Sequence, residues 1–293
     1  MTQTVTRPVE AVDPIWDAVR ADAELAMRSD PSLGGFLCRV VLNHERLEDA
    51  VADRVAERLH STDIPADTIR HEFDEAERGE PDWGARIRID LQAVLDRDPA
   101  CNRHLEPLLY FKGFHALQAH RLAHSLWRRR RHDMALFLQS MMSSVFQIDI
   151  HPATHVGRGV FIDHGTAIVV GETAVIEDRV SILQGVTLGG TGKETGDRHP
   201  KVRSGVLIGA NASVLGNIEI GDCAKVAAGS VVLKSVPPRT TVAGVPARTI
   251  GATGCDEPSA AMNQLLGIGG ATSGAQSTAA EVAGSTDNPG RDA

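Results

Sequence analysis

The chain has 293 residues, 42% of them hydrophobic, which is enough for one large domain or two modest ones. Its 38 acidic and 30 basic residues give a formal net charge of -8, which argues against a general nucleic-acid binder or a protein held on an anionic membrane. No signal-peptide pattern stands near the N-terminus and no apolar run approaches the roughly 20 residues that cross a bilayer, so we expect a cytoplasmic protein.

The first half of the chain has a helical pattern. From Pro14 to about Phe146, apolar residues recur every three or four positions. Steps of the type Asp-Pro, Ile-Pro and Glu-Pro cut this pattern into short helices. The longest helical pair is expected over 108–146. We therefore predict an all-α N-terminal domain over 1–145.

After Asp149 the period of the apolar residues changes to six. Aliphatic or small residues stand at this interval in two runs, Ile150, Val156, Ile162, Ile168, Ala174, Val180 and Val186, then Val202, Ile208, Val214, Ile220, Val226 and Val232. One short strand and a turn per six residues, with three such units per coil, predict a triangular parallel β-helix over 146–252. A β-sandwich is disfavoured, because its strands alternate by two and turn at less regular intervals.

Two segments do not follow this repeat. The stretch 188–200 is rich in glycine and polar residues, and we expect it to leave the β-helix as a loop. Beyond 252 the composition falls into Gly, Ala, Ser and Thr, which supply too little apolar surface for a core. The segment 253–293 is therefore predicted to be a disordered, flexible tail.

His164 stands inside a predicted coil that is otherwise aliphatic, which makes it a candidate catalytic base. The ordinary pKa of imidazole, near 6.5, lets a neutral histidine accept a proton at physiological pH. Asp149 lies 15 residues earlier, slightly less than one coil of about 18 residues. Its carboxylate could thus approach the ring from the neighbouring coil and hold the tautomer. On spacing alone, a surface histidine near an unrelated aspartate explains the pattern equally well.

Charged residues near His164 and in the loop suggest the kind of ligand. Asp163 precedes His164, and Arg198 and His199 stand in the predicted loop. A carboxylate can pair with the ammonium group of an amino acid, and an arginine can grip its carboxylate in bidentate fashion. Surface ion pairs that merely stabilise the loop are the alternative.

A metal site and a nucleic-acid site are both disfavoured. The stretch contains His151, His155, His164 and His199, but no histidine lies one coil of about 18 residues from His164, so we predict no metal. The basic run 128–131 lies in a helical stretch of an acidic protein and lacks interleaved aromatic residues. It favours a solvated helix face or a subunit contact over nucleic acid.

Several motifs resemble those of one known family. They are Asp149-Ile-His-Pro152, Asp163-His-Gly165, Val170-Gly-Glu-Thr173, Thr187-Leu-Gly-Gly-Thr-Gly192, Gly196-Asp-Arg-His-Pro-Lys201 and Ala243-Gly-Val-Pro-Ala-Arg248, with Asp98-Pro-Ala and Pro107-Leu-Leu-Tyr-Phe-Lys-Gly-Phe114 upstream. From roughly Asp90 to Ile250 the chain is similar to serine acetyltransferase. Hexapeptide repeats alone are shared by many acyltransferases, whereas the Asp-His motif combined with Gly-Asp-Arg-His-Pro and the helical domain is specific.

This resemblance implies a fold, an assembly and a reaction. The β-helix is expected to be left-handed, and the protein a homotrimer with active sites between neighbouring subunits, commonly paired into a dimer of trimers through the helical domains. The implied reaction is transfer of the acetyl group of acetyl-CoA to L-serine, the first step toward cysteine. His164 is then the general base, Asp149 supports it, and the alkoxide attacks the thioester without an acyl-enzyme. No serine or cysteine stands beside a base in a nucleophile motif, which agrees with direct transfer.

Matching positions imply the binding residues. Serine recognition is assigned to Asp98, Asp163, Arg198 and His199, and the CoA side to Gly190, Ala210, Lys225 and Ala228. Small residues let a pantetheine arm lie close to backbone amides, and lysine complements phosphate.

The resemblance also bears on partners and leaves other functions open. Many members end in an isoleucine that enters O-acetylserine sulfhydrylase, whereas this sequence ends at Ala293, which argues against that complex. L-cysteine is expected as a feedback inhibitor at the serine site. The alternatives are acetylation of another hydroxyl, such as that of homoserine, a sugar or a xenobiotic, and a catalytically idle β-helix scaffold.

Overall fold

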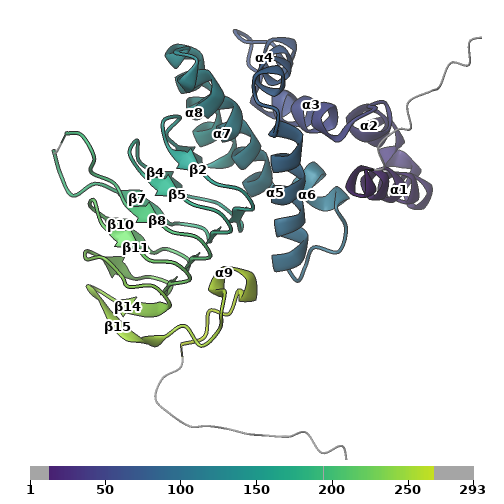
Figure 1. Ribbon diagram of the computed structural model, residues 1–293. Coiled ribbons are helices and arrows are strands. Elements are labelled where there is room, and N and C mark those ends of the chain that lie inside the picture. The colour runs from purple at the N-terminus through teal and green to yellow at the C-terminus, as the bar shows by residue number, and fades with distance from the viewer. Residues whose placement is uncertain (1–12, 194, 267–293) are drawn as a thin grey trace, which may run out of the picture.

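The N-terminal half of the chain is built from helices (Figure 1). The computed structural model describes residues 13–193 and 195–266. The helices of this half are α1 (Pro14–Ser29), α2 (Gly34–Leu37), α3 (Leu47–Leu59), α4 (Ala66–Gly79), α5 (Trp83–Arg97), α6 (Leu105–Tyr110), α7 (Lys112–Arg128) and α8 (His132–Phe146), with a 3-10 turn at Pro31–Leu33 and a π-helical stretch at Cys38–Leu42. The predicted all-α half is confirmed.

Local sequence explains where key helices begin and end. α1 begins at Pro14 because Asp13 Oδ1 accepts a hydrogen bond from the amide of Trp16 at 3.3 Å and proline is tolerated in a first turn. α5 ends at Arg97, since the following Asp98 precedes a proline. α7 and α8 pack against each other as the pair expected over 108–146 and lead into the β-helix. Within the described residues, no helix combines the length and apolar character needed to cross a membrane.

From Ile148 onward, short strands stack in three sheets. The first sheet contains β1 (Ile148–Ile150), β4 (Ile168–Val170), β7 (Thr187–Gly189), β10 (Ser213–Leu215) and β13 (Val231–Val232). The second contains β2 (His155–Val156), β5 (Val175–Ile176), β8 (Lys201–Val202) and β11 (Glu219–Ile220). The third contains β3 (Phe161–Ile162), β6 (Ser181–Ile182), β9 (Leu207–Ile208), β12 (Lys225–Val226), β14 (Thr240–Gly244) and β15 (Ala247–Ala252). Apart from the antiparallel pair β14 and β15, the strands pair in parallel, which confirms the predicted parallel β-helix.

The stacking register differs from the expected one near the start of the β-helix. Ile150 pairs with Val170, 20 residues later, whereas Val170 pairs with Leu188 after 18. The unbroken six-residue register predicted through Ile168 is therefore wrong, and two extra residues lie in the turn that precedes β4. The six-residue interval of apolar residues continues across this insertion because each strand contributes to two rows of buried, inward-facing residues, as at Ile148 and Ile150. After the insertion, the apolar residues spaced by six belong to the other inward row, the one that contains Ile148.

A buried ion pair joins the helical half to the β-helix. Asp90 on α5 is fully buried, and its Oδ2 accepts a hydrogen bond from Arg121 Nε on α7 at 2.7 Å. Arg121 Nη2 also donates to the carbonyl of Gly157 at 2.7 Å, and Asp90 Oδ1 accepts from the amide of Gly159 at 2.8 Å. Because both charges are paired and hydrogen-bonded, their burial leaves no lone charge. This contact fixes α5 against the first coil.

Residues 253–266, expected to begin the flexible tail, lie against the rest of the molecule. The short helix α9 (Pro258–Ala261) contacts α5 and β9. The Ser181 hydroxyl on β6 donates to the carbonyl of Ser259 at 2.8 Å. These residues are therefore part of the folded molecule, and the remainder of the predicted tail, 267–293, lies outside the described residues.

Candidate functional site

The two extra residues of the first coil belong to a turn that exposes a histidine. After β3 the chain passes through Asp163, His164 and Gly165 before it reaches β4. His164 has a left-handed backbone with φ 55°, as has Ala167 with φ 61°. This conformation costs a residue with a side chain roughly 1–2 kcal/mol. Such strain is found where the surroundings impose it, and other turns of this β-helix share it, as at Arg179, Asn211 and Cys223. The His164 side chain is 75% exposed.

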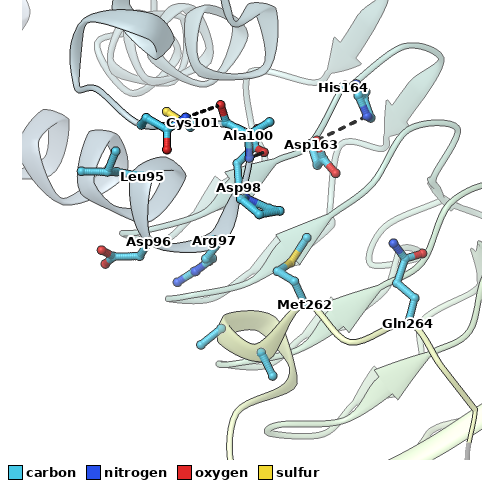
Figure 2. A pocket seen from close by; sticks show the side chains of 14 residues that line it. Leu95, Asp96, Arg97, Asp98, Ala100, Cys101, Asp163, His164, Met262 and Gln264 are labelled. Carbon is cyan, nitrogen blue, oxygen red and sulfur yellow. Dashed lines mark hydrogen bonds and ion pairs between the residues drawn. The ribbon is translucent and has the colours of Figure 1, made fainter. Parts of the chain in front are cut away.

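Asp98, Asp163 and His164 line one cavity of about 770 Å³ between the helical half and the β-helix (Figure 2). Asp98 directly follows α5, and its Oδ1 accepts a hydrogen bond from the backbone amide two residues later at 2.9 Å. His164 Nε2 lies 3.8 Å from Asp163 Oδ1. Met262 and Gln264, from the segment after α9, form another side of the cavity.

The charges in this cavity suit a cationic group. Burial raises the pKa of Asp163, the nearby His164 lowers it, and the Asp98 charge raises it again. The net effect is a raised pKa, chiefly because burial disfavours the charged carboxylate, and the repulsion from the Asp98 charge adds to it. An ammonium group placed between the two carboxylates would relieve this repulsion and form charge-assisted hydrogen bonds.

Asp149 lies in β1, next to the residue that packs on the turn at Gly165. It is the middle residue of β1, and its Oδ1 accepts a hydrogen bond from Gln139 Nε2 on α8 at 2.6 Å. In the described part of the chain, no hydrogen bond or ion pair joins Asp149 to His164. The adjacent Ile148 packs on Gly165, where an added Cβ would collide with its side chain. The contact predicted from spacing is not formed here, because Asp149 faces α8 and the first coil is longer than assumed.

Arg198 and His199 form a second cluster in the loop between β7 and β8. Arg198 Nη2 lies 2.9 Å from Glu172 Oε2, and Thr173 Oγ1 lies 2.9 Å from His199 Nδ1. His199 is 7% exposed, and burial, followed by the Arg198 charge, lowers its pKa, which favours the neutral imidazole. Gly171 leaves the space for this ring, since an added Cβ would collide with His199 Nε2.

The two clusters occupy different corners of the β-helix. His164 stands in the turn that leads from the third sheet to the first, whereas Arg198 and His199 stand in the loop that leads from the first sheet to the second. No hydrogen bond or ion pair links the clusters within 13–193 and 195–266. The predicted serine-binding set is thus present as two pairs, Asp98 with Asp163 and Arg198 with His199.

The residues predicted on the CoA side differ in exposure. Gly190 borders the loop, with Arg198 as its neighbour, while Ala228 is exposed and Ala210 partly so. Lys225 is only 5% exposed, and its Nζ donates to the carbonyl of Leu265 at 2.7 Å. Burial lowers the Lys225 pKa. The lysine expected to face phosphate therefore lies beneath the segment 262–266 in this structure.

The structure adds residues to the cavity that sequence patterns did not single out. Met262 and Gln264 come from the segment expected to be tail, whose composition carries no signal of a binding surface. Lys112, on the first turn of α7, lines a second cavity of about 400 Å³ that also includes Asp98 and His164. Its only sequence signal is its place in the motif 107–114.

The histidines weighed as metal ligands are dispersed. His151 lies edge-on to Trp127, and His155 lies beside α7, while the other two occupy the clusters described above. Across the described residues, no group of three or more His, Cys, Asp and Glu side chains could hold a metal ion.

The stacked hexapeptide coils and the cavity beside them define the class of transferases with hexapeptide repeats. Residues 199–234 match the family model for the bacterial transferase hexapeptide (six repeats). Residues 15–119 match the model for the N-terminal domain of serine acetyltransferase.

Whole-chain comparisons narrow this class to one family. The chain is 53% identical to serine acetyltransferase of Salmonella typhimurium (strain LT2), over 88% of this chain and 94% of that protein. Serine acetyltransferase from Brucella abortus strain S19, solved in complex with coenzyme A, is 61% identical with a TM-score of 0.82, covering 84% of this chain and 98% of that one. Soybean serine acetyltransferase, solved with serine, is 48% identical with a TM-score of 0.79, covering 80% and 97%. The chain therefore belongs to the serine acetyltransferase family of enzymes.

Proposed function

We propose that this chain transfers the acetyl group of acetyl-CoA to the hydroxyl of L-serine, giving O-acetyl-L-serine and CoA, as the first step of cysteine biosynthesis. The observation that carries this proposal is the convergence of Asp98, Asp163 and His164 on one cavity. Two carboxylates fit the ammonium group of an amino acid, and an imidazole beside them fits a proton acceptor for its hydroxyl. The relatives solved with serine and with coenzyme A support both ligands.

His164 acts as the general base in this proposal. Its ring takes the proton of the serine hydroxyl, the oxygen attacks the thioester carbon of acetyl-CoA, the C–S bond breaks, and the proton passes to the departing CoA sulfur. Asp149 fixes the tautomer of the neutral imidazole and stabilises the imidazolium that forms when the ring takes the proton. This role is compatible with β1 bordering the turn and with a His164 side chain that is 75% exposed and has room to rotate.

The remaining predicted residues bind the two substrates. Asp98 and Asp163 hold the serine ammonium, and Arg198 and His199 hold its carboxylate. The small residues of the CoA side, Gly190, Ala210 and Ala228, leave backbone amides within reach of the pantetheine arm and of the developing oxyanion. Lys225 is assigned to the CoA phosphates, which requires the segment 262–266 to move from its place over Nζ.

Direct transfer is favoured over an acyl-enzyme because the thiol that lines the cavity is a poor nucleophile. Burial raises the pKa of Cys101 to about 11, and its Sγ donates to the carbonyl of Arg103 at 3.6 Å. The reactive form of cysteine is the thiolate, so this thiol is protonated at neutral pH. Cys101→Ala should keep kcat within about twofold of the wild type. A loss comparable with that of His164→Ala would instead assign Cys101 a covalent role.

The complete site is proposed to form between two copies of the chain in a homotrimer. Each site would join the Asp98, Asp163 and His164 cluster of one subunit to the Arg198 and His199 cluster of the next, since these clusters occupy different corners of one β-helix. Mixed trimers of His164→Ala and Arg198→Ala subunits should then regain activity, because some sites pair two intact clusters. Inactive mixtures would locate the site in one subunit. Light scattering would show whether trimers pair through the helical domains.

The test of the reaction is release of CoA by the purified protein with acetyl-CoA and L-serine, repeated with L-homoserine. Turnover with serine should exceed turnover with homoserine, and His164→Ala should lower kcat by about 10²–10⁴-fold with the assembly intact. A variant with near-wild-type kcat would exclude His164 as the base. L-cysteine is expected to inhibit in competition with serine, and inhibition that serine does not relieve would place cysteine elsewhere.

A further inference from the structure

The turn 163–167, which carries His164, differs from the regular turns of the β-helix. It is two residues longer than a regular turn, and His164 and Ala167 both have left-handed backbones. Its far end is held by backbone bonds, from the Ala167 amide to the carbonyl of Gln147 and from the Gly185 amide to the carbonyl of Thr166, each at 2.8 Å. On the His164 side, the Asp163 amide donates to the carbonyl of Ile182 at 2.9 Å, and His164 Nε2 lies 3.8 Å from Asp163 Oδ1.

Within the described residues, one side-chain hydrogen bond reaches the turn 163–167 from the helical half. Lys112 Nζ on α7 donates a hydrogen bond to Thr166 Oγ1 at 2.5 Å. In the described part of the chain, no carboxylate lies within 4.0 Å of Lys112 Nζ. The ammonium group therefore interacts with Thr166 of the turn rather than with a carboxylate, although Lys112 lines the same cavity of about 400 Å³ as Asp163 and His164.

The helix that carries Lys112 is itself fixed in place. The next residue, Gly113, packs so tightly on the carbonyl oxygen of Ile162 that an added Cβ would collide with it. Further along α7, Arg121 is locked to Asp90 and to the carbonyl of Gly157. Lys112 thus holds the turn against a rigid support.

We propose that Lys112 and Thr166 form a positioning pair that orients the turn 163–167 and so places His164 for proton transfer. The inference rests on the proposed role of His164 as the base. Without the pair, the left-handed residues can relax toward ordinary backbone conformations, and the imidazole leaves the productive geometry more often. Rate depends steeply on such placement, so kcat falls, while acetyl-CoA binding at the other coils is unaffected.

The test uses Thr166→Val, which removes the hydroxyl at nearly constant volume, and Thr166→Ser, which keeps it. Thr166→Val and Lys112→Met should each lower kcat by about tenfold with the KM for acetyl-CoA unchanged, and Thr166→Ser should stay within about twofold of the wild type. The double variant should be no slower than either single variant, because both remove one contact. Fully additive losses, or a Lys112→Met effect confined to the KM for serine, would overturn the pair.

Two further comparisons separate this inference from the proposed function. Thermal unfolding and light scattering should be alike for the valine and serine variants, so a shared loss of stability cannot explain a difference in kcat. In a His164→Ala background, Thr166→Val should lower the residual rate no further. If His164→Ala is inactive but Thr166→Val keeps wild-type kcat, the positioning pair alone is refuted. If His164→Ala stays active, both the role of His164 as the base and the role of the Lys112–Thr166 pair are refuted.

Discussion

Two carboxylates that share one cavity make Asp163 a source of instability in the unliganded protein. Its pKa is raised, first by burial and also by the Asp98 charge, although His164 partly offsets this. Above the ordinary aspartate pKa, the ionised form is therefore less favourable in the folded than in the unfolded chain. We expect Asp163→Asn to raise the free energy of unfolding by roughly 0.5–2 kcal/mol at about pH 7, and to raise the KM for serine. Urea unfolding and CoA release measure the two effects.

The stability gain of Asp163→Asn should depend on pH in a defined direction. As pH falls through the raised pKa, the folded wild type takes up the proton before the unfolded chain does, so the cost of the buried charge disappears. Asparagine has no such step. The difference between the two proteins should therefore shrink toward acid pH, and a constant difference would rule out the buried carboxylate as its cause.

Residues that interrupt the six-residue repeat could be predicted from the sequence, whereas residues that hold those interruptions in place could not. Asp163 and His164 could be predicted because they stand where an aliphatic coil has no structural use for them. Lys112 and Thr166 are 54 residues apart and obey no period, so their contact follows only from how α7 packs on the β-helix. The contact between Lys225 and the carbonyl of Leu265 could not be predicted for the same reason.

At the scale of elements, the first turn of α7 is pressed against the backbone of β3. A Cβ at Gly113 would collide with the carbonyl oxygen of Ile162 and lie 3.1 Å from its Cβ, and backbone cannot yield as a flexible side chain can. We expect Gly113→Ala to destabilise the protein by about 1–3 kcal/mol and to lower kcat, since α7 also carries Lys112. In α4, Gly79 has no atom within 4 Å of an added Cβ. Gly79→Ala should therefore be neutral or stabilising, by up to about 1 kcal/mol in thermal unfolding.

The β-helix itself could be predicted from the sequence, but the place where its first coil lengthens could not. Both inward rows are apolar, so the six-residue interval continued from Ile162 to Ile168 although the structure pairs Ile168 with Ile148 rather than Ile150. An insertion of two residues changes which of the two buried rows falls at the six-residue interval, and because both rows are apolar the sequence pattern looks the same. The lengthened turn is the one that carries His164, so the site coincides with the irregularity that the periodic pattern concealed.

At the scale of the whole molecule, the ion pair between Asp90 and Arg121 couples the helical half to the β-helix. The two side chains are 0% and 3% exposed. Asp90→Asn leaves a buried guanidinium without its counter-charge, and we expect a loss of about 3–5 kcal/mol in the free energy of unfolding. The exposed pair between Glu24 and Arg28 is the matched control, where Glu24→Gln should change stability by less than about 0.5 kcal/mol. Equal effects of both substitutions in urea unfolding would contradict this coupling.

Buried histidines should make the whole molecule sensitive to acid. His115 and His120 on α7 are 0% and 1% exposed, and burial lowers the pKa of each to about 3. The unfolded chain takes up these protons near the ordinary value of 6.5, whereas the folded chain does so only near 3. Stability therefore falls as pH drops through this window, by roughly 1.4 kcal/mol per pH unit for each histidine.

His120→Gln should remove one of these protons from the balance, because glutamine does not titrate. Glutamine can still donate a hydrogen bond to the carbonyl of Thr154, which lies 3.2 Å from His120 Nε2. Between about pH 6 and about pH 4.5, the pH slope of the free energy of unfolding should become shallower by about one proton. The exposed His71 supplies the control, and His71→Gln should leave the slope as it is. If both variants kept the wild-type slope in urea unfolding, protonation of His120 would not contribute to acid unfolding, and the destabilisation would have to arise at other groups.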